Sequence, residues 1–275
     1  MDILLLIKYI VLGMIQGFTE PLPISSSGHL VIFSELFGVS IDDLNFEIIV
    51  NAGSLVAIVF IFRKDIFNII VNSFKYLFKK QKDFKRDFDY ALMIIIGVIP
   101  AGLFGFIFKD FIETSLKNLA VVGLSLIVTA IALNLVNKQA IDNSNEDITF
   151  KDALVIGVFQ IFALIPGISR SGSTMVGGLS RKIKFEDTMR FSFMLYIPIS
   201  VASMALGIFD IANNGTDDIY ITGYIFAFIA SIITTYFAVK WFFKVVRQGN
   251  LKYFAMYCLV VGFATLILNF AMEVL

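Results

Sequence analysis

Charged residues are scarce in this chain. Only 16% of its 275 residues are charged, whereas 58% are hydrophobic and the mean hydropathy is +0.85. Soluble domains carry about a quarter charged residues, so this composition argues against a water-soluble protein. The 22 Lys and Arg residues balance the 22 Asp and Glu residues, so no nucleic-acid partner is expected. Because Cys258 is the single cysteine, neither an internal disulfide nor a CxxC metal site can form.

Long apolar runs are what the chain has instead. A helix needs about 20 mostly apolar residues to cross the hydrocarbon core of a bilayer. Six runs approach or exceed that length, so we predict an all-α, polytopic membrane protein with six transmembrane helices. The runs cover residues 46–62, 90–108, 119–137, 191–209, 219–239 and 251–272.

The Lys and Arg residues between these runs predict the orientation of the chain. Segment 63–89 carries eight cations, and segments 181–190 and 240–252 carry four each, whereas 210–218 carries none. Cytoplasmic loops are enriched in Lys and Arg, so the three basic segments are placed in the cytoplasm as loops. Both chain termini then lie outside.

Two further apolar stretches, 3–37 and 153–180, are interrupted midway. The interruptions read PLPISSSG from Pro21 and PGISRSG from Pro166. Pro removes a backbone donor and Gly weakens a helix, so each stretch is predicted to form two half-helices around a bent tip. With the orientation above, they become two re-entrant hairpins that enter the membrane from opposite faces.

The two interrupted stretches also resemble each other. A shift of 144 positions aligns eight identical residues in the ungapped window 11–28. Each copy precedes three predicted spans, an odd number, so the second copy is predicted to be inverted relative to the first. In such inverted repeats the site usually lies near the midplane, where the tips meet. The chain is read as one membrane domain, 1–275, with repeat one at about 1–137, a cytoplasmic linker at 138–152 and repeat two at about 153–275.

The residues at the two tips suit chemistry on an anion, because ionisable groups at membrane depth are costly and usually functional. His29, the only histidine, is a candidate nucleophile or general acid–base, although a lone His is often structural. Arg170 offers a planar set of donors that fits phosphate oxygens. Glu20 can bind a hard divalent cation or orient His29. A purely structural ion pair is the alternative for Glu20 and Arg170.

Backbone groups are expected to contribute as well. Half-helices that begin near Gly28 and Gly172 would aim N–H groups and partial positive charge at the same cavity. The catalytic candidates are His29, Glu20, Ser26 and Ser27, and Glu20 is also the candidate metal ligand. The substrate-binding candidates are Arg170, Ser25, Ser169, Ser171, Gly172, Ser173, Thr174, Gln16 and Gln160.

The two tip motifs resemble those of the undecaprenyl-diphosphate phosphatase family, the bacitracin-resistance type. The family's first motif, (E/Q)-G-x-T-E-F-L-P-V-S-S-(S/T)-G-H, is matched by QGFTEPLPISSSGH at residues 16–29. Its second motif, P-G-x-S-R-S-G-x-T, is matched by PGISRSGST at residues 166–174. Segment 191–198 adds further similarity, and the resemblance extends over essentially the whole chain.

The resemblance implies removal of the terminal phosphate from a C55 polyprenyl diphosphate at the outer leaflet, which recycles the carrier lipid of cell-wall synthesis. It also implies a bacterial cytoplasmic (inner) membrane and a divalent cation, Mg²⁺ or Ca²⁺. The chain departs from the family pattern at Gln16, where many members have a second Glu, at Pro21, where Phe is usual, and at Asn51, where Gln is common. These departures bear on the substrate and cation preferences rather than on the activity.

A transporter or flippase of a phosphorylated lipid or small anion is the alternative, because inverted repeats with midplane hairpins occur in transporters. His29 beside a serine cluster favours hydrolysis, since an anion carrier needs no nucleophile. The nucleophile is Ser26 or Ser27 activated by His29, His29 itself, or a metal-bound water, and the sequence does not choose among them. The sequence does not choose between a monomer and a homodimer.

Overall fold

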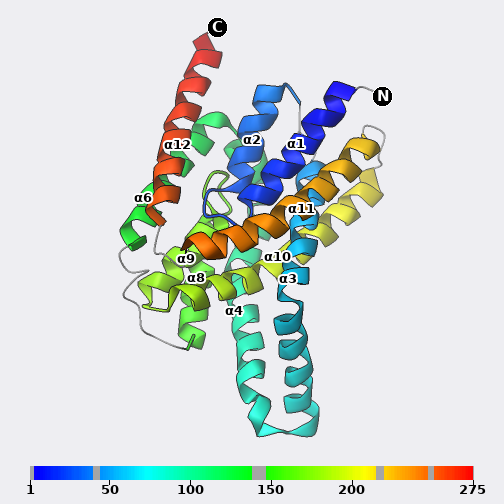
Figure 1. Cartoon of the computed structure of the whole chain (residues 1–275), viewed down its shortest axis with the longest axis vertical. Coiled ribbons are helices and arrows are strands. Elements are labelled where there is room, and N and C mark those ends of the chain that lie inside the picture. Colours follow the sequence, from blue (N-terminus) through cyan, green and yellow to red (C-terminus); the bar gives the residue numbers. More distant parts are fainter. Residues whose placement is uncertain (1–2, 40–43, 138–146, 215–219, 247–250, 275) are drawn as a thin grey trace.

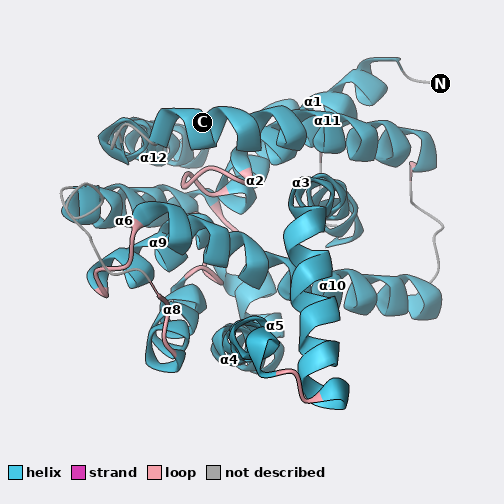
Figure 2. Cartoon of the chain, turned by 60° about the horizontal axis from the view of Figure 1, so that its bottom comes forward, coloured by secondary structure: helices cyan, strands magenta, loops and turns pink. Residues whose placement is uncertain are grey.

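The computed structural model describes residues 3–39, 44–137, 147–214, 220–246 and 251–274. Within these ranges the chain is helical and contains no β-strand (Figures 1 and 2). The elements are α1 (Ile3–Thr19), α2 (Ser26–Phe37), α3 (Leu44–Lys79), η1 (Lys82–Phe84), α4 (Lys85–Ile107), α5 (Lys109–Phe111), η2 (Ile112–Leu116), α6 (Leu119–Asn137), α8 (Phe150–Phe162), α9 (Arg170–Ser180), α10 (Phe185–Asn214), α11 (Ile221–Val246) and α12 (Leu251–Val274).

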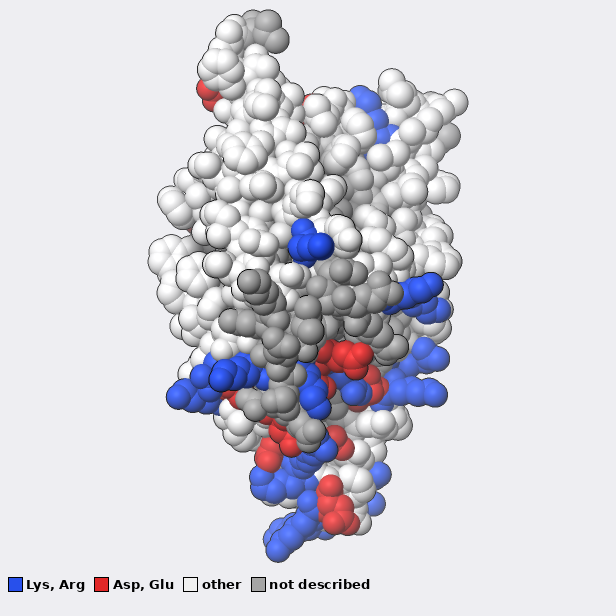
Figure 3. All heavy atoms as spheres, turned by 60° about the vertical axis from the view of Figure 1, so that its left-hand side comes forward, with Lys and Arg blue, Asp and Glu red and all other residues white. Residues whose placement is uncertain are grey.

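Six of the described helices, α3, α4, α6, α10, α11 and α12, are long and apolar enough to cross a membrane. They fall on the six predicted runs, and α6 has the predicted bounds. An all-α, multi-pass membrane protein is therefore confirmed. Figure 3 shows the charged side chains gathered over the lower part of the molecule, while the upper part of this face is nearly uncharged.

The segment 63–89, predicted to be a loop, is mostly helical, so that prediction is wrong. α3 continues to Lys79 and α4 begins at Lys85, and together they form a helical hairpin that projects from the lower end of the bundle (Figure 1). Asn72 Nδ2 donates to Asp87 Oδ2 across this hairpin at 2.6 Å. The apolar residues between the cations of this segment recur at helical spacing, which is why the helices continue through it.

Close helix crossings hold the bundle together. Gly157 on α8 lies against Gly97 on α4, where an added Cβ atom would come within 2.4 Å of the Gly97 carbonyl oxygen. Gly13 on α1 lies against Ala227 on α11, and its Cβ would be 2.2 Å from the Ala227 oxygen. Small residues permit this approach, which matters in lipid because no hydrophobic force drives helices together there. These crossings fix α8 against α4 and α1 against α11.

Two helix–turn–helix units, α1–α2 and α8–α9, form the stretches predicted to be broken helices. The ends of each unit lie close together. Lys8 Nζ donates to the Phe37 carbonyl at 2.5 Å in the first unit, and Arg181 Nε donates to Asp152 Oδ1 at 2.7 Å in the second. Figure 1 shows the turn between α1 and α2 in the middle of the molecule and their free ends at its upper edge. Each unit therefore returns toward the side from which it starts.

The second helix of each unit begins two residues before the predicted position, at Ser26 for α2 and at Arg170 for α9. Most of the predicted linker, residues 138–146, lies outside the described residues. α8 begins at Phe150, inside the range assigned to that linker. The division into two repeats stays a prediction.

Candidate active site

α2 and α9 begin in the same way. Ser25 caps α2, where its Oγ accepts from the backbone N–H of Gly28 at 3.3 Å, and Ser169 caps α9, where its Oγ accepts from Gly172 at 3.1 Å. The two capping serines are 144 positions apart, the shift that aligns the two stretches. A serine cap satisfies one of the four N–H groups left free at a helix start. The other N–H groups and the helix dipoles favour an anion near these two termini.

The turns that precede these two helices touch each other, and we call their contact region the junction. Ser171 Oγ on α9 donates to the carbonyl of Leu22 in the first turn at 2.9 Å. Gly28 lies so close to Gly167 of the second turn that an added Cβ would come within 2.9 Å of the Gly167 Cα. Thr129 on α6 supports the second turn by donating to the Gly167 carbonyl at 3.1 Å. The two predicted tips are therefore in contact.

Glu20 is the centre of a polar cluster at the junction. Its carboxylate accepts hydrogen bonds from the Arg170 guanidinium and from Ser26 Oγ. Gln16 Nε2 also donates to Glu20 Oε2, at 2.9 Å. The Glu20 side chain is 8% exposed and that of Arg170 17%, so the ion pair is largely shielded. Such a pair needs its additional hydrogen bonds, because desolvation of two charges otherwise offsets their attraction.

A tyrosine to which sequence reasoning assigned no role holds Arg170 from the other side. The guanidinium carbon lies 3.9 Å from the centroid of the Tyr196 ring on α10, a cation–π contact. Tyr196 is buried, and its hydroxyl donates to Asn51 Oδ1 on α3 at 2.7 Å. Arg170 is therefore fixed between the Glu20 carboxylate and an aromatic face. The sequence carried two weak signals for this arrangement: the similarity of segment 191–198 to the family, and a polar Asn51 in an apolar helix.

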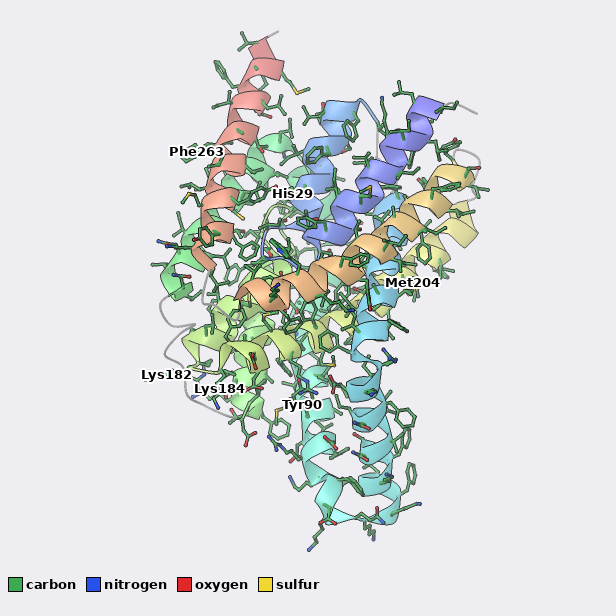
Figure 4. The ribbon with its side chains drawn as sticks, in the orientation of Figure 1. His29, Tyr90, Lys182, Lys184, Met204 and Phe263 are labelled. Carbon is green, nitrogen blue, oxygen red and sulfur yellow. The ribbon has the colours of Figure 1, made fainter. Side chains whose placement is uncertain are left out.

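His29 lies on the first turn of α2 and is buried (Figure 4). Its Nδ1 lies 2.7 Å from the Ser25 carbonyl and its Nε2 lies 2.8 Å from the Tyr257 hydroxyl on α12. A carbonyl can only accept, so Nδ1 carries the proton and Nε2 of the neutral ring accepts from Tyr257. Both ring nitrogens are thus engaged away from Ser26 and Ser27. Activation of a serine by His29 stays a prediction, and it requires Tyr257 to release Nε2.

The other predicted substrate-binding residues mostly hold α9 in place. Thr174 Oγ1 donates to the Arg170 carbonyl at 3.0 Å and lies 2.6 Å from Ser192 Oγ on α10. Gln160 on α8 is buried, and neither of its amide atoms has a hydrogen-bond partner among the residues that the structure describes. Among the predicted site residues, the structure brings together Gln16, Glu20, Ser26 and Arg170. It places Ser25, Ser169, Ser171, Gly172 and Thr174 in the caps and turn contacts, and it leaves Ser27, His29, Gln160 and Ser173 outside that hydrogen-bonded cluster.

A divalent cation would find one protein carboxylate at the junction. In the part of the chain that the structure describes, no three His, Cys, Asp or Glu side chains group as a metal site. Mg²⁺ is commonly bound by one or two carboxylates together with phosphate oxygens and water. Glu20 and the Ser26 hydroxyl fit an ion whose remaining ligands come from a diphosphate. They do not form a metal cage by themselves.

The fold and the junction define a multi-pass membrane protein with a shielded ion pair beside two helix N-termini. A family model described as "Bacitracin resistance protein BacA" matches residues 9–264. Because this match covers most of the chain, the protein belongs to that family of bacitracin resistance proteins.

Named relatives agree with the family match. Undecaprenyl-diphosphatase 1 of Bacillus cereus is 45% identical over 261 residues, which are 95% of this chain and 97% of the relative. Undecaprenyl-diphosphatase 1 of Bacillus licheniformis is 44% identical over 97% of this chain and 99% of its own length. Undecaprenyl-diphosphatase of Oceanobacillus iheyensis is 43% identical over 95% and 96% of the two chains.

Proposed function

We propose that this protein is an undecaprenyl-diphosphate phosphatase, an enzyme that hydrolyses undecaprenyl diphosphate to the monophosphate and phosphate. The monophosphate product is the carrier lipid of peptidoglycan synthesis. The observation that carries the proposal is the contact of Arg170 with Glu20 where α2 and α9 both begin. The relatives that match nearly the full chain bear the name of this activity.

In this proposal, Arg170 and the N-termini of α2 and α9 bind the diphosphate of the substrate. A guanidinium presents two parallel donors to phosphate oxygens, and the free N–H groups of a helix start bind the same kind of group. The ion pair with Glu20 and the Tyr196 ring hold the guanidinium in one orientation before substrate arrives. Charge on the transferring phosphoryl group is then stabilised without reorganisation of the site.

The geometry favours Ser26 as nucleophile and Glu20 as its base, because the Ser26 hydroxyl already donates to Glu20 Oε2. Ser26 Oγ bonds to the terminal phosphorus, the bond from phosphorus to the bridging oxygen breaks, and the Ser26 proton passes to Glu20. Prenyl monophosphate leaves with the proton from Glu20. Water then attacks the phosphorus, the bond from phosphorus to Ser26 Oγ breaks, and Ser26 regains a proton from that water through Glu20 as phosphate is released. The alternatives predicted from the sequence are Ser26 or Ser27 activated by His29, His29 itself, and a metal-bound water. With Ser26 as the nucleophile, Ser26→Ala should abolish turnover while Ser27→Ala retains part of it. Equal loss in both variants would contradict this assignment.

A divalent cation, Mg²⁺ or Ca²⁺, belongs to the proposal. Glu20 and Ser26 would hold it together with diphosphate oxygens, and the ion would neutralise charge on the phosphates. The proposal expects phosphate release to stop in chelator and to return with the preferred cation. The preferred cation is the one that restores phosphate release at the lower concentration.

The membrane arrangement is also proposed: α1–α2 and α8–α9 are re-entrant hairpins of an inverted repeat in the bacterial inner membrane, with both termini outside. The paired ends of each unit and the serine caps 144 positions apart support it. Substrate would then enter from the outer leaflet. Labelling of single cysteines in a Cys258→Ser background should find residues 213–217 accessible in intact cells and residues 80–86 protected. The reverse pattern would contradict the orientation.

A transporter or flippase of a phosphorylated lipid or small anion is the competing function, because helix breaks near the midplane are transporter architecture. One experiment separates the two. Purified protein in liposomes is given undecaprenyl diphosphate or a C15 diphosphate with Mg²⁺, Ca²⁺ or chelator, and phosphate release and lipid translocation are both measured. Phosphate release supports the phosphatase. Translocation without release under every cation condition would overturn it.

A further inference from the structure

One face of α3 carries exposed apolar residues at the spacing of a coiled coil. The positions alternate between three and four residues apart, as the a and d positions of a heptad do. We call this face the α3 seam. Its six apolar members are between 47% and 65% exposed. The seam consists of Val56, Phe60, Arg63, Phe67, Ile70, Phe74 and Leu77.

The lower half of the seam extends beyond the bilayer. α3 has 36 residues, which at about 1.5 Å per residue span about 54 Å, whereas the hydrocarbon core is about 30 Å thick. The helix from Leu44 to Arg63 already matches that thickness. The rest belongs to the projecting hairpin (Figure 1), whose end carries Lys79, Lys80 and Lys82 and would be costly to bury in lipid.

Large apolar side chains left bare in water mark an interaction surface. The side of α3 opposite the seam already has a partner, since Asn72 hydrogen-bonds to Asp87 and the Tyr76 ring lies 5.0 Å from the Phe88 ring of α4. The seam itself faces away from the hairpin. It also runs away from the membrane, so lipid cannot cover its lower half.

We propose that the α3 seam packs against the α3 seam of a second copy of this chain, as a parallel two-stranded coiled coil. The bilayer gives every copy the same orientation and depth, so two α3 helices meet in parallel and in register without further ordering. A second copy also covers the seam continuously from the lipid-facing Phe60 to the water-exposed Leu77. A soluble partner would cover only the lower half.

Charge along the seam is compatible with this pairing. In a parallel coiled coil the flanking g residue of one helix meets the e residue five positions on in the other. That rule pairs Ile66 with Val71 and Ser73 with Phe78, so no like charges face each other there. Lys75 points away from the seam. Arg63 is the one charged seam residue, and it lies at the membrane boundary, where its long side chain can reach headgroup phosphates.

Cysteine cross-linking in membranes tests the proposal. In a Cys258→Ser background, Ile70→Cys and Leu77→Cys place thiols on the seam, while Asn68→Cys and Lys79→Cys are exposed controls off the seam. A disulfide needs Cα atoms within about 7 Å, which only positions on the seam would meet in the proposed dimer. After mild oxidation, the seam variants should therefore give at least about ten times more disulfide-linked dimer than the controls. Equal yields, or no dimer from either seam variant, would overturn it. If a different protein covered the seam, neither seam variant would give a dimer.

The assembled mass provides an independent measurement. Wild-type protein in lipid nanodiscs or mild detergent should have the mass of a dimer, and Phe67→Glu with Phe74→Glu should convert it to a monomer. Lys75→Glu, a charge change on the same helix away from the seam, should remain dimeric. A monomeric wild type, or a dimer that persists after both seam substitutions, contradicts the proposal. The result does not depend on phosphatase activity.

Discussion

The two turns that meet at the junction share a backbone framework but differ in chemistry. Each leads into a helix capped by a serine, and these serines are 144 positions apart. At the first position of each helix, Ser26 stands where Arg170 stands in the other, and both bind Glu20. The counterpart of Glu20 in the second turn is Leu164. The repeated framework therefore supplies two helix N-termini, and a few unequal positions supply the charges.

The same comparison explains the two glutamines. Gln16 donates to Glu20, whereas its counterpart Gln160 has no hydrogen-bond partner within the described ranges, and Leu164 stands where the acid would be. A buried amide without a partner costs free energy and calls for an explanation. In the proposed reaction centre, the charges therefore come from positions at which the two halves differ, not from those that they share.

Removing the acid should have the largest effect of any change within this comparison. Glu20→Leu gives the first turn the residue of the second and deletes both the proposed base and the partner of Arg170. Turnover should fall by about 10⁴-fold, the upper end of what a positioned base contributes. The measurement is phosphate release. Leu164→Met is the matched control and should retain activity.

Because Glu20→Leu also leaves a shielded charge unpaired, folding must be checked by melting temperature. Glu20→Gln keeps hydrogen-bonding capacity and should fold, yet remain nearly inactive. A folded Glu20→Gln with wild-type turnover would remove Glu20 from the mechanism.

His29 has no counterpart in the second turn, where residue 173 is serine. His29→Ala tests the acid–base role predicted from the sequence, which the proton transfer from Ser26 to Glu20 does not itself require. With that role, the variant should lower the maximal rate by about 10²-fold while substrate binding survives on Arg170. Tyr257→Phe, which deletes only the hydroxyl that bonds His29 Nε2, should cost about tenfold or less, the scale of one hydrogen bond. Tyr253→Phe is an exposed control on the same helix. An unchanged maximal rate in His29→Ala would exclude a catalytic role.

The glutamine pair should respond in opposite directions. Gln160→Met replaces a buried, unpartnered amide with an apolar side chain and should raise the free energy of unfolding by about 1–3 kcal/mol. Because Gln160 is a predicted substrate-binding residue, the same variant should also raise KM. Gln16→Met deletes a hydrogen bond to Glu20 and should destabilise. Thermal melting and steady-state kinetics check both, and a destabilised Gln160→Met would mean that its amide has a partner in the protein.

The smallest expected effect is at the ends of the second unit. Burial alone acts to raise the pKa of Asp152, but hydrogen bonds from Thr149 and Arg181 outweigh it and lower the pKa below its usual value. A lowered folded-state pKa stabilises the protein above the unfolded pKa, about 4, and this contribution is lost as pH falls through the folded value. Asp152→Asn should cost about 1 kcal/mol at pH 7. The difference should vanish in acid, and a difference that grows toward low pH would contradict this assignment.

Much of this arrangement could be predicted from sequence because its signals are local. The six spans follow from run length, and the two turns follow from Pro21 and Pro166, which interrupt otherwise apolar stretches. The full length of α3 does not follow from run length, because cations interrupt the apolar residues that recur at helical spacing beyond residue 62. Tyr196 and Tyr257 were missed because their partners lie on other helices, and only the folded chain brings them together.

Phosphate release by Arg170→Lys is the most direct measurement of the central claim, that the contact of Arg170 and Glu20 between the two turns is the reaction centre. Lysine keeps the positive charge but loses the planar pair of donors and the stacking on Tyr196. With undecaprenyl diphosphate and the preferred cation, the account predicts that wild type releases phosphate. It predicts that Arg170→Lys, folded and with an unchanged melting temperature, is slower by about 10²–10³-fold. Full activity in Arg170→Lys would contradict the claim, and so would a wild type that releases no phosphate with any divalent cation.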